Sequence, residues 1–358
     1  MIRSKSVPKA RALPTIEIAG AGPAGLTAAI VLARRGHRVR VFERSRGVGT
    51  RFNDDFQGIE NWTSEADSLE ELRALGVETT WWARPFVASE LYDSSLRRAE
   101  VRASRPLFYC VRRGAADPNS LDNALRRQAE SLGVEICFGR AAGADAVSIF
   151  AGGPAGRPTA VARGVTFELD RPAVSCTILS DATPSGYTYF LAAEGMATIG
   201  TVLVRSFNDS DVQLGDACAT VERLYGFRVP ACSRRWTGVA RFSIPAPPVR
   251  QTALFAGEAA GFQDALLGFG IRIAMISGAL AAIAVSEGGD YEKAWRARLL
   301  PQLKASRVNR AIYQHAGSTK KALWTLARST TDGIALLRYL YAWNVVHKLA
   351  APVCWLRA

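Results

Sequence analysis

The chain has 358 residues, of which 48% are apolar and 22% charged, as in an ordinary folded protein. This composition excludes a disordered chain, a collagen-like repeat and a small disulfide-stapled scaffold. The formal net charge of +13 lies at the two ends: residues 1–14 carry +4, residues 289–358 carry +9, and the segment between them holds 29 residues of each sign. A chain that coats nucleic acid usually carries its basic face through the folded body. We therefore expect no nucleic-acid partner.

Cysteine and histidine are sparse and scattered. None of the six cysteines forms a C-x-x-C pair, and the three histidines are far apart in the sequence. This pattern indicates reduced thiols in a cytoplasmic protein and no metal site. No uncharged apolar run reaches the roughly 18–20 residues that a membrane span needs, and the N-terminus lacks the apolar run of a signal peptide. We expect a cytoplasmic protein, either soluble or peripheral on the inner face of a membrane.

The first apolar segment of the chain opens a strand–turn–helix–strand pattern. Residues 15–19 form a short apolar run that contains β-branched residues, and this predicts a strand. Residues 26–35 are strong helix formers that end at Gly36, and residues 38–43 predict a second strand. This is the context that the G-x-G-x-x-G motif of dinucleotide-binding proteins requires. The turn consists of Gly20, Ala21, Gly22, Pro23, Ala24 and Gly25.

Each glycine of this motif has a physical task. Gly20 permits the tight turn, Gly22 lets backbone N–H groups approach a pyrophosphate, and Gly25 lets the helix pack closely on the strand. The phosphates would lie at a helix N-terminus, which favours negative charge. Glu43 ends the second strand and can accept hydrogen bonds from a ribose diol, which favours FAD or NAD over NADP. The sequence therefore predicts dinucleotide binding.

A second glycine cluster lies far downstream. Residues 252–256 predict a buried strand, and it runs into Gly257 and Glu258. The sequence Gly268-Phe-Gly270-Ile271 follows, and residues 271–286 predict a long helix ended by glycine. Together with the first motif, this pattern resembles the FAD-dependent oxidoreductases related to geranylgeranyl reductase and the aromatic hydroxylases.

The resemblance implies a cofactor and the residues that hold it. In that family an acid in the late motif hydrogen-bonds FAD, and here Glu258 replaces the usual Asp. The G-x-G-I turn opens a helix whose N-terminus faces the flavin. A strand–Arg–helix segment at residues 108–125 places an arginine near the cofactor, with Arg113 as the candidate and Arg112 in reserve. The expected FAD-binding residues are Gly20, Gly22, Pro23, Ala24, Gly25, Glu43, Arg44, Arg51, Arg113, Gly257, Glu258, Gly268, Gly270 and Ile271.

The remaining chain is divided by its patterning. Residues 77–110 and 163–245 alternate apolar and polar residues, which predicts an antiparallel sheet. We expect an α/β fold in which a Rossmann-type FAD-binding domain carries an inserted antiparallel β-sheet substrate domain and a C-terminal helical cap. The expected boundaries are 15–60, 106–160 and 246–288 for the FAD domain, 61–105 and 161–245 for the substrate domain, and 289–358 for the basic helical region.

Two tyrosines are candidates for the catalytic role. Residues 186–200 resemble the aromatic segment of the prenyl reductases, although Tyr189 stands where tryptophan is expected. Tyr187 and Tyr189 have the same parity, so in a strand they point to one face. They would hold a substrate or supply a proton. The alternative is that both rings belong to the core.

The C-terminal segment combines basic and aromatic residues. Residues 291–311, 319–327 and 331–349 predict three helices with tryptophan and tyrosine among lysine and arginine. Such helices suit the boundary between an anionic membrane and water. The alternative is a solvated helical subdomain whose aromatic rings pack on the core.

Three functions remain open on the sequence. The first is an FAD-dependent oxidoreductase that transfers hydride between flavin and a hydrophobic isoprenoid or lipid-like substrate, with NAD(P)H or another reductant as electron donor. The second is an FAD-dependent monooxygenase that hydroxylates a small or natural-product-like substrate. The third is a non-catalytic flavoprotein or a membrane-associated scaffold. The oligomeric state is left undetermined by the sequence.

Overall fold

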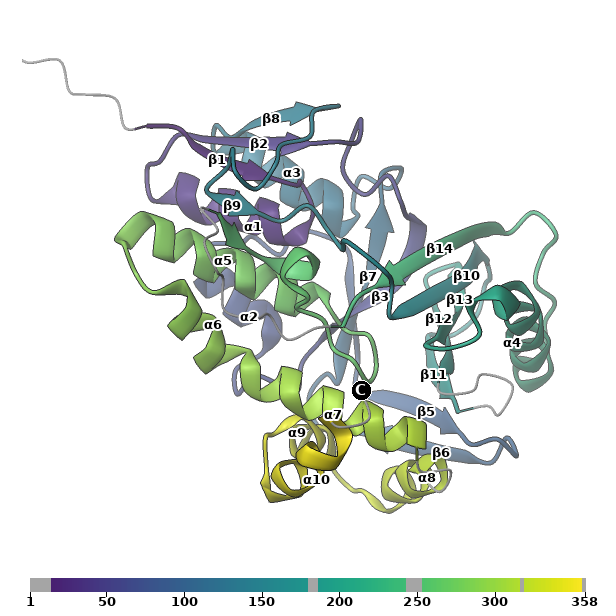
Figure 1. Ribbon diagram of the computed structural model, residues 1–358. Helices are drawn as coiled ribbons and strands as arrows, with labels where there is room; N and C mark the ends of the chain where they lie inside the picture. Colours follow the sequence, from purple (N-terminus) through teal and green to yellow (C-terminus); the bar gives the residue numbers. More distant parts are fainter. Residues whose placement is uncertain (1–13, 180–185, 243–252, 316–318, 356–358) are drawn as a thin grey trace, which may run out of the picture.

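Figure 1 shows the computed structural model, which describes residues 14–179, 186–242, 253–315 and 319–355. The basic segment 1–13, Arg357 and the expected boundary at residue 246 lie outside the described residues. The predicted α/β architecture is confirmed, with a parallel sheet, a separate antiparallel sheet and C-terminal helices. None of the helices in the described part of the chain combines the length and apolar character that crossing a bilayer requires.

A parallel sheet of five strands forms the upper left of Figure 1. In spatial order the strands are β15 (Leu254–Phe255), β9 (Ile149–Phe150), β1 (Ile16–Ala19), β2 (Val39–Glu43) and β8 (Glu135–Phe138). Several helices share one apolar cluster with it, among them α1 (Pro23–Arg34), α3 (Leu121–Ser131) and α5 (Ile271–Glu287). α5 has buried residues on all sides because it is apolar almost throughout.

A seven-stranded sheet lies to the right in Figure 1. In spatial order its strands are β14 (Arg234–Ala240), β10 (Ala160–Glu168), β13 (Met196–Leu203), β12 (Tyr187–Ala193), β11 (Val174–Ile178), β5 (Ala88–Tyr92) and β6 (Arg98–Arg102). All neighbours are antiparallel except β11 and β5. The helix α4 (Ser210–Tyr225) covers one face of this sheet, and the sequence had not predicted it.

A third, smaller sheet lies between the other two (Figure 1). It consists of β3 (Asn53–Glu60), β7 (Phe108–Gly114) and the edge strand β4 (Ala83–Phe86), and the short helix α2 (Ser68–Ala74) follows β3. The alternating stretch 77–110 is therefore divided between two sheets instead of one. Pro85 suits the edge position of β4, because proline has no N–H to donate to a further strand.

The C-terminal region forms five helices where the sequence predicted three. They are α6 (Tyr291–Arg298), α7 (Leu300–His315), α8 (Thr319–Ser329), α9 (Gly333–Tyr341) and α10 (Val345–Trp355). Pro301 stands in the first turn of α7, where its missing N–H costs nothing, and this explains the break after α6. Two short 3₁₀ turns complete the fold: η1 (Phe207–Asp209) and η2 (Gly257–Ala260).

Candidate functional site

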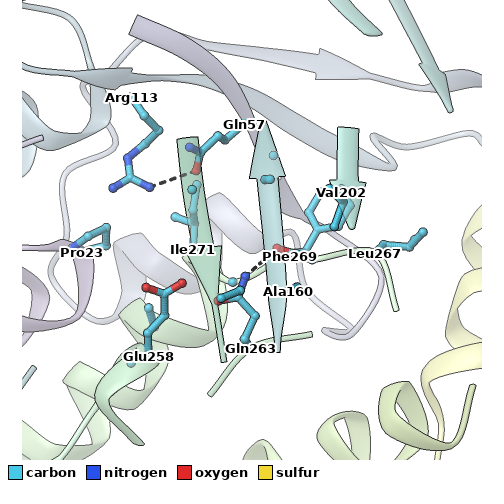
Figure 2. Close-up of a pocket in the computed structure, with 18 of the residues that line it drawn as sticks. Pro23, Gln57, Arg113, Ala160, Val202, Glu258, Gln263, Leu267, Phe269 and Ile271 are labelled. Atoms are coloured by element: carbon cyan, nitrogen blue, oxygen red, sulfur yellow. Dashed lines mark hydrogen bonds between the residues drawn. The ribbon is translucent and has the colours of Figure 1, made fainter. Parts of the chain in front are cut away.

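A cavity of about 660 Å³ joins the three parts of the fold. It starts at the turn after β1, passes between the parallel and the seven-stranded sheets, and ends against α8 and α9. Figure 2 shows Pro23 and Glu258 at one side of this space, with Val202 and Leu267 at the other. The cavity therefore connects the predicted dinucleotide site with the predicted substrate domain.

The glycines after β1 meet different constraints. A Cβ at Gly20 would lie 2.2 Å from the carbonyl oxygen of Ala151, and Gly20 also has a φ of +96°. A Cβ at Gly25 would lie 1.9 Å from the carbonyl oxygen of Gly20. These two glycines are required by the protein itself. A Cβ at Gly22 would meet nothing within 4 Å, and Gly22 lines the cavity, so its backbone is open to a ligand.

Two helix N-termini converge on the same cavity. α1 and α5 cross closely: Gly278 of α5 lies against the backbone of α1, and a Cβ added to it would be 2.1 Å from the carbonyl oxygen of Ala24. Their N-caps are Gly22 and Gly270, and neither has a side chain that caps the helix. The unpaired N–H groups and the helix dipoles therefore favour an anionic ligand at both places. Gly257, Gly268 and Ile271 line the cavity between them.

Glu43 holds the turn together from the end of β2. Its carboxylate accepts hydrogen bonds from the backbone N–H groups of Ala21 and Ser45, both at 2.8 Å. A carboxylate has about four acceptor positions, so two of them are left for a ligand. Glu43 and the next residue, Arg44, both line the cavity. The predicted contact of Glu43 with a ribose stays a prediction.

The structure brings Arg51 and Glu258 together across the cavity. Arg51 Nη2 lies 3.2 Å from Glu258 Oε2, and the carboxylate side chain is 19% exposed while that of the arginine is 49% exposed. The two residues are 207 positions apart in the sequence. Their pairing makes this end of the cavity nearly neutral, so an anionic ligand would depend on the helix N-termini for attraction.

Arg113 is buried in the wall of the cavity. It forms two bonds with Asp122, at 2.8 and 2.9 Å, and donates from Nη1 to Gln57 Oε1 at 3.2 Å (Figure 2). Burial disfavours its charge, but the nearby carboxylates, Asp122 foremost and then Asp55 and Glu258, together outweigh burial and raise the pKa of Arg113. Arg112 points elsewhere, to Asp117 at 2.9 Å. Of the two candidate arginines, only Arg113 lines the cavity.

Tyr187 and Tyr189 both line the cavity from β12, as their parity requires. The Tyr187 hydroxyl donates a hydrogen bond to the carbonyl oxygen of Leu267 and so stabilises the turn before Gly268. The Tyr189 ring lies over Gly200, where a Cβ would be 2.5 Å from it. Burial raises the pKa of Tyr189 well above its ordinary value, so its hydroxyl stays protonated at neutral pH.

The sequence reading missed several residues that shape the cavity. Trp236 on β14 lies over Gly164 and stacks near Tyr189, with ring centroids 6.5 Å apart. Gln263 donates from Nε2 to the carbonyl oxygen of Gly268 at 2.9 Å (Figure 2). Its Oε1 atom is buried and has no hydrogen-bond partner among the described residues. Trp236 acts through contacts between distant segments, which no local pattern reveals. The Gln263 contact spans only five residues, but it belongs to no motif that the sequence reading used.

The far end of the cavity is apolar. Its walls there come from β12, the loop before α5 and the C-terminal helices. The side chains that line it are Leu179, Leu191, Leu266, Phe269, Leu323, Leu326, Leu336, Leu337 and Leu340. Such a surface favours an apolar ligand over a charged one. No cluster of His, Cys, Asp and Glu able to hold a metal ion is found in the described part of the chain.

Several known proteins are similar to this chain in part of the sequence or in fold. The model of the NAD(P)-binding Rossmann-like domain matches residues 18–59. No curated protein matches the chain in sequence. A geranylgeranyl bacteriochlorophyll reductase-like protein from Thermoplasma acidophilum superposes with a TM-score of 0.74 at 16% identity, covering 94% of this chain and 99% of the other.

Two further solved structures share the architecture. A flavoprotein/dehydrogenase from Cytophaga hutchinsonii has a TM-score of 0.67 at 15% identity, covering 94% of this chain and 96% of the other. A triple mutant of a flavin-dependent brominase has a TM-score of 0.65 at 16% identity, covering 94% and 97%. The resemblance to geranylgeranyl reductase-like and other flavin-dependent proteins is confirmed at the level of the fold.

Proposed function

We propose that the chain is an FAD-dependent oxidoreductase that acts on a hydrophobic, isoprenoid or lipid-like substrate. One observation carries this proposal: a single cavity joins two uncapped helix N-termini to an apolar chamber. The polar end suits the phosphates of a dinucleotide. The apolar end suits a substrate without charge. The solved structures of the same fold include reductase-like, dehydrogenase and halogenase flavoproteins, which supports the choice of cofactor.

The residues present fit FAD. Because Gly22 has no side chain, the space beside its backbone is open. The N-terminus of α1, which begins there, would hold the pyrophosphate in this space. Glu43 would accept from the ribose, and Glu258 from the ribityl region. The buried, unpartnered Oε1 of Gln263 lies beside Gly270, where a Cβ would be 2.9 Å from it. It would accept a hydrogen bond from the flavin ring and so be satisfied.

FAD, when bound, supplies hydride transfer, which is the difficult part of the chemistry. The chain's own residues have simpler tasks. The leucines at the far end of the cavity would orient an apolar substrate and exclude water. Tyr189 would donate the proton that accompanies hydride in the reduction of a double bond, since its side chain lines the cavity and carries a hydroxyl. Tyr187 would hold the turn at Gly268 instead of reacting.

Flavin binding is tested first. The purified protein should be yellow, release FAD on denaturation and be reduced anaerobically by NADH, NADPH or dithionite. Gly22→Ala should weaken FAD binding at least tenfold while leaving the fold intact, because the added methyl group meets only open space. Gly215→Ala, in α4 and also facing open space, is the matched control. A colourless protein whose addition does not quench FAD fluorescence would contradict the proposal.

The reaction class is tested separately. If FAD is bound, a reductase of this kind would be reoxidised by an isoprenoid substrate without oxygen. A monooxygenase would instead consume oxygen in proportion to substrate hydroxylated. We expect anaerobic reoxidation by substrate, and Tyr189→Phe to slow it by about 100-fold, the lower end of what a general acid contributes. Oxygen uptake coupled to a hydroxylated product would favour the monooxygenase.

A further inference from the structure

Exposed apolar side chains are concentrated on the last three helices. Eight large apolar residues are exposed in the described part of the chain, and five of them belong to α8, α9 and α10. We call these five the C-terminal apolar surface: Leu326, Tyr339, Val345, Val346 and Leu349. The three helices form the lower end of the molecule in Figure 1. Large apolar side chains exposed in one region of a molecule often belong to a contact surface.

The orientation of α10 is set by its inner side. His347 is buried, and its ring nitrogens lie 2.7 Å from Asn344 Oδ1 and 3.1 Å from Asn309 Oδ1. Val345 and Leu349, one turn apart, are 66% and 75% exposed. Because the inner side of the helix is held by hydrogen bonds, these valine and leucine side chains cannot turn inward without breaking them.

The aromatic residues of this region mostly face the core. Trp324 is buried and donates from Nε1 to the carbonyl oxygen of Arg97 at 2.8 Å. Tyr341 is buried too, and its hydroxyl donates to Asp264. The expected belt of interfacial rings is therefore not formed by these two residues. The outward surface is aliphatic, apart from Tyr339.

Three exposed cations lie on the helices that carry the C-terminal apolar surface. Lys321, Arg328 and Lys348 are exposed on α8 and α10. Asp332 is the sole acidic residue after Glu292 in the full sequence. It caps α9, where its side chain accepts from the N–H groups of Ile334 and Ala335. The helices of this surface thus combine exposed aliphatic side chains with an excess of basic over acidic residues.

The cavity reaches this surface. Leu323 and Leu326 of α8 and Leu337 and Leu340 of α9 line the cavity. Leu326 also belongs to the C-terminal apolar surface, with 44% of its area exposed. One side chain therefore borders both the inner chamber and the outside of the molecule.

We propose that the C-terminal apolar surface docks on an anionic lipid bilayer and that the cavity opens onto the bilayer beside Leu326. Aliphatic side chains would enter the headgroup region, and Lys321, Arg328 and Lys348 would pair with anionic headgroups. A bilayer fits better than a second copy of the chain. A two-fold dimer on this surface would bring the same three cations together without acids to compensate them. The docking itself does not depend on the proposed redox chemistry.

The test is co-sedimentation of the full-length protein with vesicles, without substrate or reductant. Vesicles of phosphatidylcholine alone are compared with vesicles that contain phosphatidylglycerol. We expect at least tenfold stronger partitioning with the anionic lipid, reduced by added salt. Two triple variants should each lose at least tenfold: Val345→Ser with Val346→Ser and Leu349→Ser, and Lys321→Glu with Arg328→Glu and Lys348→Glu.

Matched controls lie on α4, at the right of Figure 1 and apart from α8, α9 and α10 at its lower end. Val212 is 68% exposed and Arg223 is exposed, so Val212→Ser and Arg223→Glu change similar groups elsewhere. Both should partition as the unmodified chain does. Equal binding to the two kinds of vesicle, or triple variants that bind like the controls, would overturn the proposal. So would light scattering that shows a dimer of the unmodified chain dissociated by the serine variant, because a second copy would then be the occupant.

Discussion

The hydroxyl of Tyr341 on α9 donates a 2.8 Å hydrogen bond to the carboxylate of Asp264, in the loop that leads to α5. The same carboxylate accepts from the backbone N–H groups of Leu266 and Leu267, each at 2.9 Å, and of Phe269 at 3.4 Å. Burial raises the pKa of Asp264 above its ordinary range, and these hydrogen bonds oppose the rise. The C-terminal helices are thus tied to the turn that opens α5.

Removing this tie should destabilise the protein. Tyr341→Phe keeps the ring but leaves a buried carboxylate with one donor fewer, which costs about 1–3 kcal/mol of unfolding free energy. Tyr339→Phe is the control, since Tyr339 lies on the same helix with its side chain 56% exposed. Urea unfolding measures both variants. Equal stability of the two would show that the Tyr341–Asp264 bond contributes nothing.

The crossing of α1 and α5 makes a second prediction. A Cβ at Gly278 would lie 2.1 Å from the carbonyl oxygen of Ala24, and backbone cannot move aside as a side chain can. Gly278→Ala should therefore cost about 1–3 kcal/mol, as overpacking does. Gly215→Ala, in the interior of α4 with open space around it, should stabilise by about 0.5–1 kcal/mol. Thermal unfolding should show opposite changes in Tm, and the same sign for both would contradict the close crossing.

The features that depend on neighbouring residues in the sequence could be predicted, and those that depend on contacts between distant segments could not. The glycine turn between β1 and α1 and the turn before α5 were predictable, because each motif sits inside a short strand–turn–helix pattern. Arg113, Tyr187 and Tyr189, which all line the cavity, were chosen from the family resemblance, and only the shared face of the two tyrosines followed from strand parity. Their roles toward a cofactor or substrate stay predictions.

Contacts between distant segments were not predictable. The Tyr341–Asp264 bond joins residues 77 positions apart, and Trp236 meets Gly164 only because β14 pairs with β10. The helix α4 lies in a segment rich in strands and was missed, although Gly226 ends it in a left-handed conformation with a φ of +70°. Pro301 could have revealed the break between α6 and α7, since proline favours the first turn of a helix.

A buried charge network gives the protein a predictable pH dependence. Arg272, 1% exposed, bonds Glu60 Oε1 at 2.8 Å and Glu71 Oε2 at 2.9 Å, and Arg298 also donates to Glu71. Burial raises the pKa of Glu71, but Arg272 and Arg298 outweigh it, so the pKa lies below its ordinary value. The stabilisation from Glu71 is therefore present at neutral pH. It is lost as the pH falls through the folded pKa, because the unfolded chain takes up the proton first.

The comparison of Glu71→Gln with the unmodified chain measures this effect. At pH 7 the variant should lose about 3 kcal/mol, the lower end of the range for breaking a buried ion pair. The difference should shrink as the pH is lowered into the acid range in urea unfolding experiments. Glu70→Gln, on the same helix but exposed, should change little at any pH. A Glu71→Gln difference that stays constant with pH would exclude titration of Glu71 as its cause.

The two cavity tyrosines should differ in their effect on FAD binding. The Tyr187 hydroxyl donates to the carbonyl oxygen of Leu267, and a Cβ at Gly268 would lie 3.0 Å from it, so this side chain supports the turn at the α5 N-terminus. Tyr187→Phe removes one hydrogen bond of about 0.5–1.5 kcal/mol and should raise the FAD Kd by roughly 2–10-fold. Tyr189→Phe, two residues along the same face, should leave the Kd unchanged. Fluorescence titration with FAD decides the matter, and equal Kd values for both variants would refute a role for Tyr187 in holding the turn.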